Sequence, residues 1–243
     1  MFILPIIKDN PVRRVPVILI SLIVVNTALL AITYIGHTPS EVFRVWGYTP
    51  AHPTWVTLFT SMFLHAGIWH LLGNMWFLWM FGNMIENALG RVWFLLSYLV
   101  CGIGAVGLFY LSDAHSVVPL VGASGAISGI AGLFVVLFPR QRFELNFYLG
   151  WWNVYETDTR ATGAVGAWIG EQIVLALLTS VVHFSSTAFA AHVGGFLTGV
   201  LIGVVARVTV FPRSIRETKN EQLWYYRDGL MTDEDSKITE LKL

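Results

Sequence analysis

The stretch that decides the fold is GASGAISGIAGLFVVLF, residues 122–138, which holds no charged residue. Two pairs of small residues lie four positions apart in it, Gly125 with Gly129 and Ser128 with Gly132. Residues at this spacing share one face of a helix, and small residues on such a face let a second helix approach closely inside a bilayer. The stretch therefore predicts a membrane helix that packs tightly against a neighbour.

The rest of the chain has the composition of a membrane protein. Of its 243 residues, 55% are hydrophobic and 12% charged, with no net charge, whereas soluble domains carry about 25% charged residues. The lack of a basic excess excludes a nucleic-acid partner, and the single Cys101 excludes a disulfide framework. A membrane helix needs about 20 mostly apolar residues, and six segments qualify. We expect an all-α membrane protein with six transmembrane helices, near residues 16–36, 63–85, 92–111, 122–138, 161–182 and 188–209.

The basic residues indicate how these helices are oriented. Lysine and arginine concentrate on the cytoplasmic side of membrane proteins. With the N-terminus in the cytoplasm, only Arg44 falls outside. We expect a cytoplasmic N-terminal segment (1–15), a six-helix membrane domain (16–209) and a charged cytoplasmic tail (210–243). The residues then inside are Lys8, Arg13, Arg14, Arg91, Arg140, Arg142, Arg160, Arg207, Arg213, Arg216, Lys219, Arg227, Lys237 and Lys242.

Polar side chains occur near the same ends of three expected helices. His70 and Asn74 lie one turn apart on the second helix, and Ser124 lies in the first turn of the fourth, where backbone N–H groups have no helical partner. His192 lies near the start of the sixth helix. At 1.5 Å per residue these four residues lie at comparable depth in the outer half of the membrane. Polar groups inside a bilayer are costly and often functional, so their common level suggests a site.

At these residues the chain resembles the rhomboid family of intramembrane serine proteases. Three motifs carry the resemblance, in the family's order and on its second, fourth and sixth helices. They are His-x4-His-x3-Asn (His65, His70, Asn74), Gly-x-Ser-Gly (Gly122, Ser124, Gly125) and Ala-His-x2-Gly-x3-Gly (Ala191, His192, Gly195, Gly199).

The resemblance implies an activity and a role for each residue. Ser124 would be the nucleophile and His192 the base, a dyad with no cofactor or metal. The backbone N–H of Ser124 and the side chains of His70 and Asn74 would bind the oxyanion. His65, Gly122, Gly125, Gly195 and Gly199 would support the site. The implied substrates are transmembrane segments of other proteins in the bilayer. We expect a multi-pass protein of the plasma membrane, with its site open to the extracytoplasmic side.

Two positions differ from the family's pattern, and the fifth expected helix carries an acidic residue. Many family members have Trp-Arg in the first outer loop, where this chain has Trp55 followed by Val56. Some bacterial members have a tyrosine that stacks on the catalytic histidine four residues after the serine, where this chain has Ser128. The fifth helix, which the family is proposed to use as a lateral gate, carries Glu171, for which we expect a structural hydrogen bond.

Three other readings of the sequence stay open. The chain could be a catalytically inactive rhomboid-like protein that binds membrane clients, although it keeps Ser124 and His192. It could be a metal or haem protein that uses its histidines, but the His-Glu-x-x-His motif is absent. It could be a transporter or channel, but it shows no evident inverted repeat. A Gly-x-Gly-x-x-Gly match beginning at Gly102 lies in an apolar helix and indicates helix packing.

Overall fold

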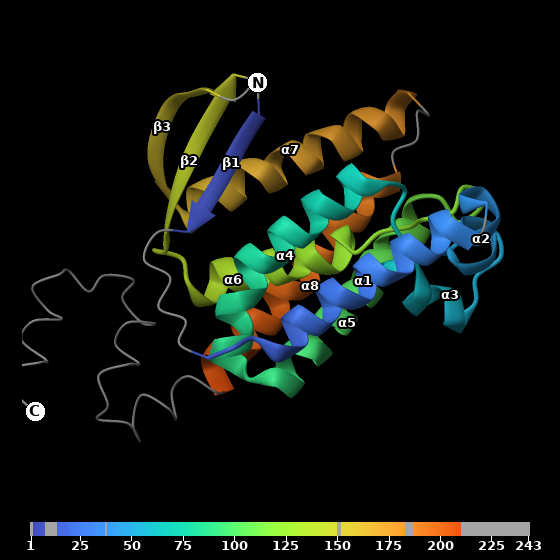
Figure 1. Cartoon of the computed structure of the whole chain (residues 1–243), viewed down its shortest axis with the longest axis horizontal. Coiled ribbons are helices and arrows are strands. Elements are labelled where there is room, and N and C mark those ends of the chain that lie inside the picture. Colours follow the sequence, from blue (N-terminus) through green and yellow to red (C-terminus); the bar gives the residue numbers. More distant parts are fainter. Residues whose placement is uncertain (1, 8–13, 37, 150–151, 183–186, 210–243) are drawn as a thin grey trace, which may run out of the picture.

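The computed structural model describes residues 2–7, 14–36, 38–149, 152–182 and 187–209. Within them a bundle of long helices carries a small sheet at one side (Figure 1). The expected tail, 210–243, and residues 8–13 of the expected N-terminal segment lie outside the described residues. In chain order the elements are β1 (Phe2–Ile7), α1 (Val17–Gly36), α2 (Pro39–Trp46), α3 (Trp55–Thr60), the 3-10 helix η1 (Ser61–Phe63), α4 (Ile68–Leu89), α5 (Arg91–Ser112), α6 (Ser124–Leu137), β2 (Arg142–Leu149), β3 (Trp152–Arg160), α7 (Ala161–Val182) and α8 (Thr187–Thr209).

All six segments expected to be membrane helices are helical, but they do not all qualify as spans. In the described chain, α1, α5, α7 and α8 are long and apolar enough to cross a membrane. The residues Trp55–Phe63 and Ile68–Leu89 form a pair bent by 90°, which counts as at most a fifth span. Helix α6 has only 14 residues, or about 21 Å of helix, which is shorter than the hydrocarbon layer. The length criterion thus supports four or five spans.

Helix α6 is the centre of the bundle. Every residue from 125 to 134 is buried, and α6 packs against α4, α5, α7 and α8. A Cβ on Gly195 of α8 would overlap the carbonyl oxygen of Gly125, and one on Gly199 would overlap that of Gly129. The close helix contact predicted from the small residues is therefore present, and its partner is α8.

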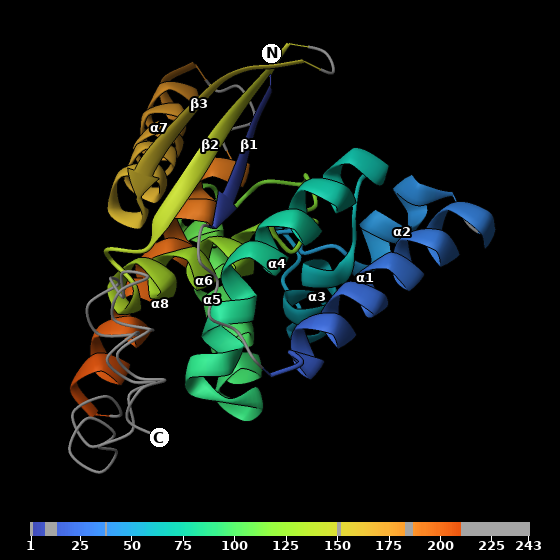
Figure 2. The ribbon, with the colours of Figure 1, turned by 60° about the vertical axis from the view of Figure 1, so that its left-hand side comes forward.

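The expectation of an all-α fold is wrong because the described chain contains a sheet. Strands β1, β2 and β3 form an antiparallel sheet in that order, beside the first turns of α7 (Figure 2). Residues 142–146 alternate between polar and apolar side chains, the period of a strand. Phe143 is buried against Phe81 of α4 and Phe134 of α6, with ring centroids 6.1 and 5.8 Å away. This aromatic contact fixes the sheet to the bundle.

A carboxylate of one helix caps the start of another. Glu86 of α4 is buried, and its two oxygens accept hydrogen bonds from the backbone N–H groups of Ile18 and Leu19, at 3.0 and 2.8 Å. Those N–H groups lie in the first turn of α1, where the helix provides no acceptor. The negative charge is also favourable there because it faces the positive end of the helix dipole. Glu86 thus binds α1 to α4.

Replacing Glu86 with alanine should lower the free energy of unfolding by about 2 kcal/mol, because one buried and one partly buried N–H group lose a charged acceptor. Denaturant unfolding of the purified protein in detergent measures the change. Glu41→Ala removes an exposed carboxylate from α2 and should cost much less. Equal losses in the two variants would contradict the capping role of Glu86.

Candidate active site

The start of α6 is held by the loop that precedes it. Leu120 and Tyr48 exchange two backbone hydrogen bonds, of 2.8 and 3.0 Å, and the N–H of Gly122 donates to the carbonyl of Ser61 at 2.9 Å. Gly122 has a φ of +133°, and a Cβ there would lie 3.0 Å from Nε2 of His70. Only glycine suits both the backbone and the space. This turn places Ser124 at the first position of α6.

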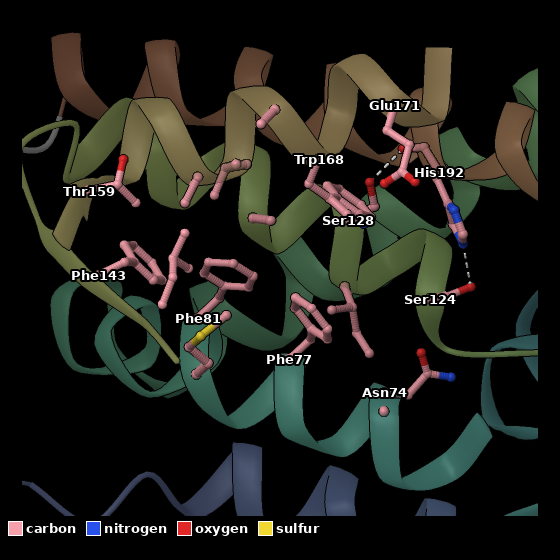
Figure 3. Close-up of a pocket in the computed structure, with 18 of the residues that line it drawn as sticks. Asn74, Phe77, Phe81, Ser124, Ser128, Phe143, Thr159, Trp168, Glu171 and His192 are labelled. Atoms are coloured by element: carbon pink, nitrogen blue, oxygen red, sulfur yellow. Dashed lines mark hydrogen bonds between the residues drawn. The ribbon is translucent and has the colours of Figure 1, made fainter. Parts of the chain in front are cut away.

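The structure brings Ser124 and His192 together. The Oγ of Ser124 lies 2.9 Å from Nε2 of His192, which comes from α8 (Figure 3). The two residues are 68 positions apart in the sequence. The glycine contacts between α6 and α8 bring the two helices close enough for this hydrogen bond, because a larger residue at those positions would separate them.

The second ring nitrogen of His192 also has a partner. Nδ1 lies 2.7 Å from Oε1 of Gln172, a buried residue of α7. With the Gln172 amide in this orientation, Nδ1 carries the proton and donates it, because an amide oxygen only accepts hydrogen bonds. Nε2 is then unprotonated and accepts the hydrogen bond from the Ser124 hydroxyl. A neutral imidazole in this tautomer can take a proton from a serine.

Two further residues contact His192, one at its backbone and one at its ring. Ser128, one turn after Ser124, donates a hydrogen bond of 2.6 Å from its Oγ to the backbone carbonyl of His192. The ring of Trp168 on α7 lies with its centroid 6.0 Å from that of the imidazole, at an interplanar angle of 37°. Ser128 occupies the position where some relatives have a stacking tyrosine. Here a ring from α7 lies beside the imidazole instead.

His70 and Asn74, on α4, line the same cavity as Ser124. Nδ1 of His70 accepts a hydrogen bond of 3.3 Å from the N–H of Ala66, so a neutral His70 carries its proton on Nε2, the atom that faces Gly122. Asn74 is 8% exposed, and its Nδ2 is buried without an acceptor among the described residues. A buried donor without a partner is costly, so Nδ2 is available for a ligand.

The remaining expected site residues have supporting positions. His65 precedes α4 and is buried, with its ring 5.2 Å from that of His70 in an edge-on arrangement. Gly122 forms the turn before the serine, and Gly125 and Gly195 lie in the contact between α6 and α8. In the described part of the chain, no three His, Cys, Asp or Glu side chains are grouped so that they could hold a metal ion.

A cavity of about 1160 Å³ opens beside Ser124 and His192. It lies between α4 and α7, and Figure 3 shows Asn74 and Phe77 on one wall and Trp168 and Glu171 on the other. Its far end reaches the sheet at Phe143 and Thr159. Most of its lining is apolar. Asn74, Ser124 and His192 lie at one end, and Thr157, Asp158 and Thr159 line the end at the sheet. The cavity thus suits an extended apolar ligand with one polar group near Ser124.

Comparisons with known proteins identify relatives of this chain. A model of the Rhomboid domain matches residues 52–208. RHOMBOID-like protein 1 of Arabidopsis thaliana is 32% identical over 154 residues, 63% of this chain and 35% of the relative. Rhomboid protein 1, mitochondrial, of Saccharomyces cerevisiae is 30% identical over 177 residues, 70% of this chain and 47% of the relative. Rhomboid protease GluP of Bacillus subtilis is 38% identical over 115 residues, 44% and 22% of the two chains. The matched region spans less than half of each of these relatives.

Proposed function

Because this multi-pass membrane protein belongs to the rhomboid family, we propose that it is an intramembrane serine endopeptidase with a Ser124–His192 dyad. The observation that carries the proposal is the 2.9 Å contact between Oγ of Ser124 and Nε2 of His192. A serine hydroxyl is a weak nucleophile until a neighbouring base can take its proton. Here that base lies at hydrogen-bonding distance in the tautomer that the reaction requires.

In the proposed reaction, Oγ of Ser124 attacks the scissile carbonyl carbon while its proton passes to Nε2 of His192. The resulting oxyanion lies among the N–H of Ser124, Nε2 of His70 and Nδ2 of Asn74. The C–N bond then breaks, and the imidazolium gives its proton to the leaving amine. Water, deprotonated by His192, hydrolyses the acyl-enzyme and restores the serine.

The cavity supports a transmembrane segment as the substrate. Such a segment is apolar and hides its backbone in internal hydrogen bonds, so it has to unwind locally to present a carbonyl to Ser124. The apolar lining between α4 and α7 suits the side chains of the segment, and the polar end suits the exposed peptide. In the orientation expected from the basic residues, this polar end faces the extracytoplasmic side of a plasma membrane. This placement is part of the proposal.

Cleavage in liposomes tests the proposed activity. We expect the protein to cut a tagged single-span substrate, to react with a fluorophosphonate at Ser124, and to be insensitive to chelators. If the protein neither cleaves the substrate nor reacts with the fluorophosphonate but still binds the substrate, it is instead an inactive rhomboid-like protein that binds membrane clients. Loss of activity in a chelator would support a metal enzyme.

Removing one oxyanion donor should lower the cleavage rate by less than removing Ser124 or His192 does. Asn74→Ala is expected to lower kcat by about 10²–10³-fold with little change in KM, because the lost hydrogen bond forms mainly in the transition state. The measurement is the cleavage rate as a function of substrate concentration in the bilayer. Asn87→Ala alters an amide near the opposite end of α4, where it bonds Asn83 and Arg14, and should leave kcat unchanged. A pure KM effect in Asn74→Ala would refute the oxyanion role.

A further inference from the structure

Gln172 has a role that the sequence motifs do not assign. We propose that Gln172, on α7, is a positioning residue that holds His192 in the tautomer and orientation of a general base. The inference rests on the proposed function, since it assigns a role within the same site. It makes the site an array of three side chains, with Gln172, His192 and Ser124 contributed by α7, α8 and α6.

The directions of the hydrogen bonds at the two ring nitrogens of His192 support this role. The 2.7 Å contact joins Nδ1 of His192 to the amide oxygen of Gln172, so the proton on Nδ1 is held there. The 2.9 Å contact on the other ring nitrogen then has Ser124 as its donor. A neutral imidazole has two tautomers, and only the one with unprotonated Nε2 can accept the serine proton. Gln172 therefore selects the reactive tautomer.

The burial of Gln172 supports this assignment. Its side chain is 7% exposed although it lies in a helix whose neighbouring residues Ile173 and Val174 are 43% and 54% exposed. A polar side chain that is buried in a membrane protein needs a hydrogen-bond partner, and the partner here is the imidazole. A glutamine that only stabilised helix packing would not need to meet this ring nitrogen.

Gln172 also supplies what a carboxylate supplies in a Ser-His-Asp triad, with one difference. It accepts the Nδ1 proton and fixes the ring, as the aspartate does. It carries no charge, so it stabilises the imidazolium less than a carboxylate would. A neutral acceptor also avoids the cost of keeping an unpaired carboxylate in a low-dielectric site whenever His192 is neutral. The arrangement therefore orients the base without placing a permanent charge beside it.

A set of substitutions tests the role of Gln172 in cleavage. Gln172→Leu keeps roughly the volume of the side chain but removes the acceptor, and it should lower kcat by about 10- to 100-fold, as loss of a residue that orients a histidine typically does, with KM unchanged. Gln172→Glu keeps an acceptor at the same reach and should restore most of the activity. Gln172→Asn is one methylene shorter and should behave as the leucine variant does. Ile173→Leu, a change on the exposed side of α7, should match the wild type.

The pattern of losses separates positioning from packing. If Gln172→Leu retains full kcat, or if the glutamate variant is as impaired as the leucine variant, the proposal is wrong. Thermal unfolding of each variant shows whether a loss follows from instability of the protein. Absence of cleavage in the wild type would instead refute the proposed function, and the next measurement does not depend on cleavage.

Nitrogen NMR of the protein labelled with ¹⁵N-histidine reports the tautomer directly. The signal missing from His192→Ala identifies the residue. In the wild type we expect the proton on Nδ1 and an unprotonated Nε2, and in Gln172→Leu we expect a mixture of tautomers. A wild-type signal with the proton on Nε2, or an unchanged signal in Gln172→Leu, would overturn the proposal whether or not the protein cleaves a substrate.

Discussion

Ser124→Ala and His192→Ala should each lower the cleavage rate by about 10⁴-fold or more, and the double variant should be no slower than either single variant. The reason is that the two side chains perform one step together, the transfer of the serine proton during attack. Removing either leaves the other without a function, so the losses do not add. The 2.9 Å hydrogen bond between them is the structural basis of this expectation.

The measurement is single-turnover cleavage of a tagged single-span substrate in liposomes, with thermal unfolding to show that the variants fold. Ser21→Ala removes an exposed serine hydroxyl from α1, and His115→Ala removes an exposed histidine from a loop. Both controls should retain the wild-type rate. Additive losses in the double variant would show that Ser124 and His192 act in separate steps, contrary to the proposed dyad.

The helices of this protein could be predicted closely from its sequence. The fourth segment, expected at residues 122–138, is α6 (Ser124–Leu137), and the fifth, expected at 161–182, is α7 (Ala161–Val182). Long uncharged runs have few alternatives to a helix in a bilayer, because every backbone group needs an internal partner. The number of spans is harder to predict. Six segments qualify by composition, but length supports four or five spans, because α6 is buried among other helices and has only 14 residues.

The sheet was missed although its signal is present in the sequence. Arg142, Glu144 and Asn146 alternate with Phe143 and Leu145, which is the period of a strand. The segment also carries charges and lies between the fourth and fifth expected helices, so the pattern of expected helices alone makes it a connection. Its pairing with β1 joins residues far apart in the sequence, such as Ile7 and Phe143. No local pattern in the sequence predicts such a pairing.

The sequence predicts a common depth for the site residues, but it does not predict the hydrogen bonds between them. Ser124, His192, His70 and Asn74 could be placed at one depth from their distance to the ends of their helices. Which ring nitrogen of His192 faces Ser124 depends on how α8 is rotated about its axis, which the sequence does not specify. For the same reason Gln172 could be read only as one more polar residue of its helix. Its partner becomes evident only when α7 and α8 are placed side by side.

The contact between α6 and α8 should be as necessary for the proposed activity as Ser124 and His192. Gly199→Val is expected to prevent folding, because a Cβ at this position already overlaps the backbone oxygen of Gly129 and neither backbone can yield without separating the helices. Gly199→Ala adds only that Cβ, and it should lower the free energy of unfolding by about 3 kcal/mol or more, because its overlap is with backbone and exceeds ordinary overpacking. Gly107→Ala and Gly107→Val are matched controls in α5, since a Cβ there meets no atom within 4 Å.

Gly199→Ala should also slow the reaction of Ser124, because Gly195, Gly199 and His192 share one face of α8. Gly199 follows His192 by seven residues, or about two turns, so a shift of α8 away from α6 moves the imidazole away from Ser124. In Gly199→Ala, fluorophosphonate labelling of the folded fraction should therefore slow, whereas in Gly107→Ala it should not. Denaturant unfolding and labelling on the same preparations separate the two effects. If Gly199→Ala were as stable and as reactive as Gly107→Ala, the glycine contact would not be what holds the serine and the histidine together.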